Sequence, residues 1–156
     1  TRKGMRACYG GNNGQSELEK ARGAIYRQSV LCREELSAIQ GDLQAAISQL
    51  HQEASSIAQY RLGASLAENS DTVRILNDGS LCNLVRRVTG DDTMVLASHL
   101  PVQVRSYEKF GANMAWHEDD VLYDPPQVEA VLTLENTSDC VTMWKEGEQV
   151  VHSKET

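Results

Sequence analysis

The chain has 156 residues, of which 40% are hydrophobic and 5% aromatic, and its formal net charge is -7. This length fits one domain with an appendage, and the acidic balance argues against a surface that tracks nucleic-acid phosphates. Its apolar runs are all shorter than the roughly 18 residues that suggest a membrane span, so we expect none.

The cysteines lie far apart, at Cys8, Cys32, Cys82 and Cys140, without a C-x-x-C pair. Such spacing favours reduced thiols over a zinc site or a disulfide framework, and it predicts a reducing, intracellular compartment. Because the chain begins at Thr1, it is compatible with a plastid or mitochondrial protein after transit-peptide removal, and equally with a fragment of something longer.

The N-terminal half is predicted to be a flexible tail over residues 1–15 and a helical region over residues 16–69. The tail is rich in Gly and Asn, and the S-x-x-E pattern of Ser16 and Glu19 predicts a helix start. Apolar residues at a spacing of three or four predict a long amphipathic helix over residues 36–60, or a helical hairpin if Gly41 and Asp42 break it.

The apolar stripe of this helix has two interpretations. It packs on the chain's own sheet, or it docks onto another protein. The candidate docking residues are Leu36, Ile39, Leu43, Leu50 and Ile57.

Residues 70–156 are predicted to form a partial β domain, so the fold class is α+β. A short helix is expected over residues 81–88, and strands over 94–97, 102–107, 114–117, 128–134 and 141–144. Residues 145–148 predict the turn of an antiparallel hairpin that returns over 149–152, and the prolines at 125 and 126 predict a loop.

His117 and Asp119 form an H-x-D pair where a predicted strand ends. A neutral imidazole and a carboxylate on one face of a metal are two of the three ligands of a 2-His-1-carboxylate Fe(II) site. The H-x-D triplet alone is weak evidence for a metal site, since it arises by chance about one time in four at ordinary composition. The strands predicted on both sides, and Trp116 beside the His, strengthen it.

Residues 101–153, through VQVRSYEKFGANMAWHEDD and VEAVLTLENTSD, resemble the Fe(II)- and 2-oxoglutarate-dependent dioxygenases, a superfamily with a jelly-roll (double-stranded β-helix) fold that includes prolyl hydroxylases. The resemblance implies that His117 and Asp119 hold Fe(II), that Tyr107 contacts 2-oxoglutarate, and that an unknown substrate is hydroxylated. Members also supply a distal His and an Arg several strands later. His152 lies too early for that role, so if the chain continues we expect both beyond Thr156.

Because the distal His and Arg of the family are not found in this sequence, two functions are possible. If the chain continues, it is part of an oxygenase whose substrate, given the acidic charge, is a protein or a small molecule rather than nucleic acid. If it ends at Thr156, the β-helix is half built, and the chain is a non-catalytic accessory subunit without a cofactor that docks through its helical region in a large assembly.

Overall fold

The structure is a computed structural model that describes residues 16–21, 24–98, 101–124, 127–138, 140–146 and 148–152. The chain divides into two units. Unit 1 comprises Thr1–Ser29, Val85–Thr93 and Val121–Thr156, and unit 2 comprises Val30–Leu84 and Met94–Asp120. The predicted tail (residues 1–15), Pro125, Pro126 and Gly147 lie outside the described residues.

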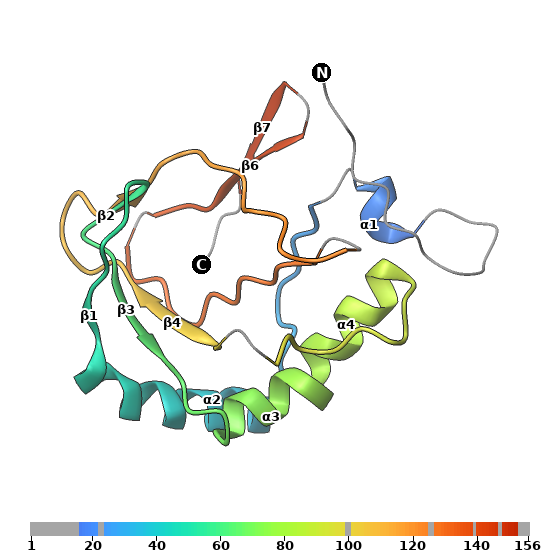
Figure 1. Cartoon of the computed structure of the whole chain (residues 1–156), viewed down its shortest axis with the longest axis horizontal. Helices are drawn as coiled ribbons and strands as arrows, with labels where there is room; N and C mark the ends of the chain where they lie inside the picture. The colour runs from blue at the N-terminus through green and yellow to red at the C-terminus, as the bar shows by residue number, and fades with distance from the viewer. Residues whose placement is uncertain are drawn as a thin grey trace. The chain divides into compact units, whose positions relative to one another are not determined.

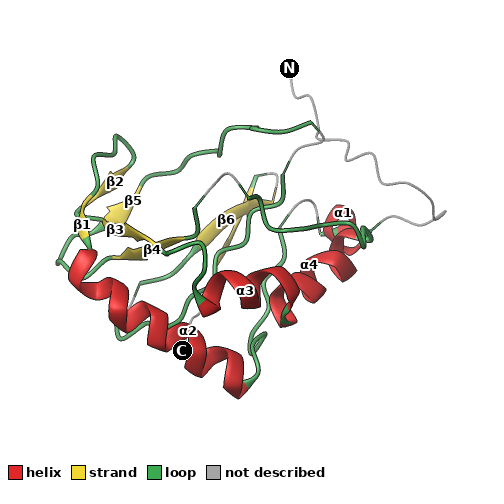
Figure 2. Ribbon diagram, turned by 60° about the horizontal axis from the view of Figure 1, so that its bottom comes forward, coloured by secondary structure: helices red, strands yellow, loops and turns green. Residues whose placement is uncertain are grey.

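Helices and short antiparallel sheets both contribute to the fold, which is α+β in class (Figures 1 and 2). The helices are α1 (Glu17–Lys20), α2 (Arg33–Ala46), the 3-10 helix η1 (Ile47–Gln49), α3 (Asp71–Asp78) and α4 (Ser80–Thr89). The strands are β1 (His51–Gln52), β2 (Ala58–Gln59), β3 (Leu62–Ser65), β4 (Gln103–Ser106), β5 (Asn113–Met114), β6 (Met143–Glu146) and β7 (Gln149–His152). Within the described ranges, no helix combines the length and apolar character that a bilayer span requires.

Unit 2 holds two of the sheets. One has the strand order β1-β3-β4, and in the other β2 pairs with β5; all these pairs are antiparallel. Its buried apolar side chains come from both helices and strands, namely Ile39, Ala46, Ala58, Ala64, Ile75 and Cys82. In unit 1, β6 and β7 form a hairpin, and the rings of Tyr26 and Trp144 stack with their centroids 6.3 Å apart.

Glu35 links the starts of two helices. Its N–H donates to the Cys32 thiol at 3.5 Å while its Oε2 accepts from the Cys32 N–H at 2.9 Å, a capping box with Cys in place of Ser or Thr. Its Oε1 accepts from the N–H of Ser80, the first residue of α4, at 2.7 Å. These bonds to backbone N–H groups of Ser80 and then Cys32 lower the pKa of Glu35 to about 2.

Asp42 makes a similar link between α2 and α3, which lie side by side (Figures 1 and 2). Its Oδ2 accepts from both the N–H and the hydroxyl of Thr72, each at 2.7 Å. Thr72 is in the first turn of α3, where backbone N–H groups have no partner within the helix, and it is buried. Ile39 of α2 and Ile75 of α3 are also buried, so the apolar stripe of α2 is used within unit 2.

The predicted helix over residues 36–60 is wrong beyond Ala46. Gly41 does not break it, since the helix runs through that position, but the chain then passes through η1 and enters β1 at His51. Tyr60 has a φ of 56°, a left-handed conformation that a right-handed helix cannot contain. The region over residues 16–69 is therefore part helix and part strand, because pairing with β4 and β5 outweighs the helical spacing of its apolar residues.

Other predicted elements have mixed outcomes. The helix over 81–88, the strand over 102–107 and the C-terminal hairpin are confirmed by α4, β4 and β6-β7. The strand over 114–117 shrinks to β5, and the strands over 94–97 and 128–134 are wrong within the described residues. Val131 is 87% exposed, so the alternating pattern there has no core to face. Sequence reasoning missed β3 and α3.

Replacing Asp42 tests the α2-α3 link. Asp42→Ala should lower the free energy of unfolding by about 1–3 kcal/mol, because the buried Thr72 N–H and hydroxyl lose their acceptor. Urea denaturation measures this change. Gln44→Ala, an exposed change on the same helix, is the control and should have almost no effect; equal stability of the two variants would contradict the link.

Glu35 makes stability depend on pH. Its pKa in the folded state, about 2, lies below the ordinary value of 4.5, so its contribution is complete above pH 4.5 and is lost as the pH falls through 2. The wild type should therefore exceed Glu35→Gln in stability at pH 6, and the difference should shrink towards pH 2. Denaturant titrations across this range measure it, with Glu34→Gln as the exposed control. If the stability difference between the wild type and Glu35→Gln stays constant from pH 6 to pH 2, the role of Glu35 is contradicted.

Candidate functional site

His117 and Asp119 lie in the irregular segment that follows β5, in unit 2. The imidazole Nε2 is 3.4 Å from the Asp119 Oδ1. The side chains are 25% and 57% exposed, so a solvated ion can reach both. The structure therefore brings together the two residues that the motif predicted as metal ligands.

Ala115 holds the imidazole in place. Its N–H donates to the Ile57 carbonyl at 2.7 Å, which continues the pairing of β2 with β5 by one residue. Its own carbonyl lies 2.9 Å from the Nδ1 of His117. A carbonyl only accepts, so we assign the proton of the neutral ring to Nδ1. The Nε2 lone pair is then free to bind a metal ion on the side of Asp119.

The spacing of these two atoms suits a metal ion. A nitrogen lone pair and a carboxylate oxygen repel unless a proton or a cation lies between them. Two ligand atoms each about 2.1 Å from one ion, at an angle of about 90–110°, are roughly 3.0–3.4 Å apart. The 3.4 Å separation of Nε2 and Oδ1 lies at the upper end of that range.

The described residues supply only part of a metal site. Among them, no group of three or more His, Cys, Asp or Glu side chains is placed to hold an ion. His152 lies on β7 in unit 1, and its side chain is outside the description. Cys32, Cys82 and Cys140 are free thiols. The imidazole and carboxylate thus fit a metal ion in chemistry and spacing, but among the described residues they are two donors where the predicted triad needs three.

Tyr107, the predicted contact of 2-oxoglutarate, directly follows β4. Its hydroxyl donates to the Met114 sulfur at 3.5 Å, and its side chain is partly exposed. Met114 is the last residue of β5, three residues before His117. An extended chain of three residues spans at most about 10 Å, so the hydroxyl is held close to the segment that carries His117 and Asp119.

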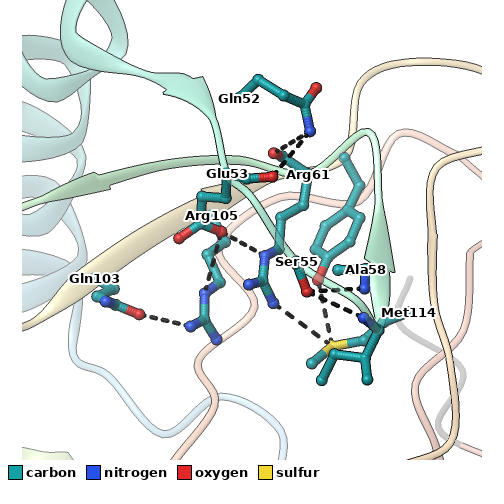
Figure 3. A network of polar contacts seen from close by, with 10 residues as sticks. Gln52, Glu53, Ser55, Ala58, Arg61, Gln103, Arg105 and Met114 are labelled. Atoms are coloured by element: carbon teal, nitrogen blue, oxygen red, sulfur yellow. Dashed lines mark hydrogen bonds and ion pairs between the residues drawn. The ribbon is translucent and has the colours of Figure 1, made fainter.

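Sequence reasoning missed a charged cluster that contacts the same Met114 sulfur as Tyr107 does. The Arg61 side chain, 9% exposed, forms an ion pair with Glu53, and Arg105 of β4 approaches the same carboxylate oxygen at 3.8 Å (Figure 3). Arg61 also directs its Nη1 to the Met114 sulfur at 3.9 Å. Arg61 precedes the strand by one residue, a position at which charge is usually exposed, so no local pattern predicts its burial.

Gly63 makes room for this cluster. A Cβ at that position would overlap the carboxyl group of Glu53. Glu53 is held further by its N–H, which donates to the Arg61 carbonyl at 3.0 Å. A glycine in a strand often marks a close approach by another group, and this is the one signal in the sequence that points to the cluster.

The candidate docking residues do not form one helical stripe. Three of them lie on α2, where Leu36 and Leu43 are half-buried and Ile39 is buried. Leu50 follows η1 and Ile57 precedes β2, so both are outside the helix.

Family models, curated proteins and solved structures contain no significant match to this chain. The function of the chain is therefore inferred from the chemistry of its own residues, above all His117, Asp119 and the groups around Met114.

Proposed function

We propose that this chain contains the metal-binding segment of an Fe(II)- and 2-oxoglutarate-dependent oxygenase. The observation that supports it is the arrangement of His117, whose Nδ1 lies 2.9 Å from the Ala115 carbonyl and whose Nε2 lies 3.4 Å from the Asp119 carboxylate. Histidines that bind metals in proteins almost always donate their other ring N–H to such a group. The imidazole is thus oriented for a metal before one binds.

In this proposal each residue has a defined task. His117 Nε2 and Asp119 Oδ1 bind one side of the ion, and Tyr107 donates its hydroxyl to a carboxylate of 2-oxoglutarate. Fe(II) in such a triad supplies open coordination positions for the cosubstrate and O2. A second His is required, and it is not among the residues that the structure describes in contact with these two.

We further propose that the sheets β1-β3-β4 and β2-β5 belong to a jelly roll. Two features support this. All three of their strand pairs are antiparallel, and two of them join segments distant in sequence, as in Leu62 with Ser106 and Ala58 with Met114. The net charge of -7 favours a protein or small-molecule substrate over nucleic acid.

The accessory-subunit function has less support. It relied on an apolar stripe from residue 36 to residue 60 facing a partner. Ile39 is only 3% exposed, and the helix ends at Ala46. A surface that is already buried within unit 2 cannot also dock a second protein without unpacking.

Metal binding tests the proposal directly. His117→Ala should weaken Fe(II) binding at least about tenfold, because it removes a ligand rather than an outer-shell partner. Calorimetry under anaerobic conditions measures the affinity, and succinate formation from 2-oxoglutarate measures turnover by the protein.

His51→Ala is a matched control. The Nδ1 of His51 also faces a carbonyl two residues earlier, that of Gln49 at 3.2 Å, but no carboxylate is paired with its ring among the described residues. This variant should bind Fe(II) as the wild type does. An unchanged affinity in His117→Ala would exclude the proposed site.

A further inference from the structure

We propose that Ser55 is a positioning residue for the metal site, because its hydroxyl shapes the start of β2 so that the Ala115 carbonyl is left to hold the His117 imidazole. The inference rests on the proposed function for the metal ion that His117 binds. The orientation of the ring itself can be measured without a metal ion.

The Ser55 hydroxyl accepts from two backbone N–H groups, that of Ile57 at 3.2 Å and that of Ala58 at 3.0 Å (Figure 3). A hydroxyl oxygen has two lone pairs, so both are used. Serine often bonds in this way to N–H groups a few residues further on, and such bonds compete with the ladder of a sheet. Ser55 is half-buried and Ala58 is buried, so loss of the hydroxyl would leave these N–H groups poorly solvated.

The pairing of β2 with β5 is incomplete beside this turn. The strands pair Ala58 with Met114, which places Ile57 opposite Ala115. Opposed residues at the hydrogen-bonded positions of an antiparallel ladder exchange two N–H···O bonds. The Ala115 N–H does donate to the Ile57 carbonyl, at 2.7 Å. The Ile57 N–H, however, donates to Ser55, and within the described part of the chain it makes no return bond to the Ala115 carbonyl.

This diversion of the Ile57 N–H leaves the Ala115 carbonyl for the metal ligand. In a complete pair that carbonyl would accept from the opposite strand. It lies here 2.9 Å from the Nδ1 of His117, and the partner at one ring nitrogen decides which nitrogen carries the proton. The Asp119 carboxylate, 3.4 Å from Nε2, competes for the same proton. Ser55 thus helps to keep the proton on Nδ1 and the Nε2 lone pair open to a metal ion.

The position of the His117 ring proton tests the inference in the metal-free protein. Histidine labelled with nitrogen-15 reports by NMR which ring nitrogen carries the proton, at about pH 9, where an ordinary imidazole is neutral. In the wild type the proton should lie on Nδ1. Ser55→Ala frees the Ile57 N–H to bond the Ala115 carbonyl, so part of the population should move its proton to Nε2, beside Asp119. Folded molecules give their own signals, so a loss of stability does not by itself produce this shift.

Two further variants complete the design. Ser55→Thr keeps the hydroxyl and should restore the wild-type position of the proton. Ser48→Ala, in the same unit, removes an exposed hydroxyl that donates to the Ala45 carbonyl at 3.4 Å, and it should leave the proton in place. By calorimetry, Ser55→Ala should bind Fe(II) about three- to tenfold more weakly than the wild type. This loss is smaller than the roughly 10- to 100-fold that follows removal of a direct hydrogen-bond partner of a ligand.

Either of two results would overturn the inference. One is a wild-type His117 with its proton on Nε2, a result that does not depend on the folding of any variant. The other is Ser55→Ala with the proton where the wild type has it. Both are read without a metal ion, whereas the proposed function is tested by Fe(II) binding in His117→Ala. Failure of the positioning role and failure of the iron site are therefore distinguishable.

Discussion

The buried ion pair between Glu53 and Arg61 is the constraint on which the sheet side of unit 2 depends. Removing either partner leaves a charge in a poorly solvated place, which is costly, so both must be positioned together. The Glu53 N–H bonded to the Arg61 carbonyl joins the ends of β1 and β3, and Gly63 leaves space for the carboxylate. Arg105 brings β4 to the same group. One charge pair thereby connects the three strands of this sheet.

The helical side of unit 2 is organised by a different requirement, the backbone N–H groups at helix starts that have no partner within the helix. Carboxylates on α2 accept hydrogen bonds from such N–H groups of α3 and α4. Glu35 accepts from the N–H of Ser80 at the start of α4, and Asp42 accepts from that of Thr72 at the start of α3. These contacts fix α2, α3 and the first residue of α4 relative to one another, and burial of Ile39 and Ile75 adds an apolar contribution.

The sheet side of unit 2 meets the candidate site at β5. Its pairing with β2 extends to Ala115, whose carbonyl orients His117, and its last residue, Met114, lies under the polar tips of Arg61 and Tyr107. In the irregular segment that follows β5, the Ala115 carbonyl contacts the Nδ1 of His117, two residues further on.

Local patterns were sufficient to predict α4, β4, the C-terminal hairpin, the α+β class and the pairing of His117 with Asp119, because each depends on residues close together in the chain. They failed over residues 47–60, where apolar spacing suited a helix but β1 pairs with β3, and β2 pairs with β5, a strand more than fifty residues away. The burial of Arg61 and its contact with Met114 were likewise decided by the tertiary structure. A charged side chain is stable there only because Glu53 lies opposite, and a pairing between the ends of two strands leaves no periodic signal in the sequence.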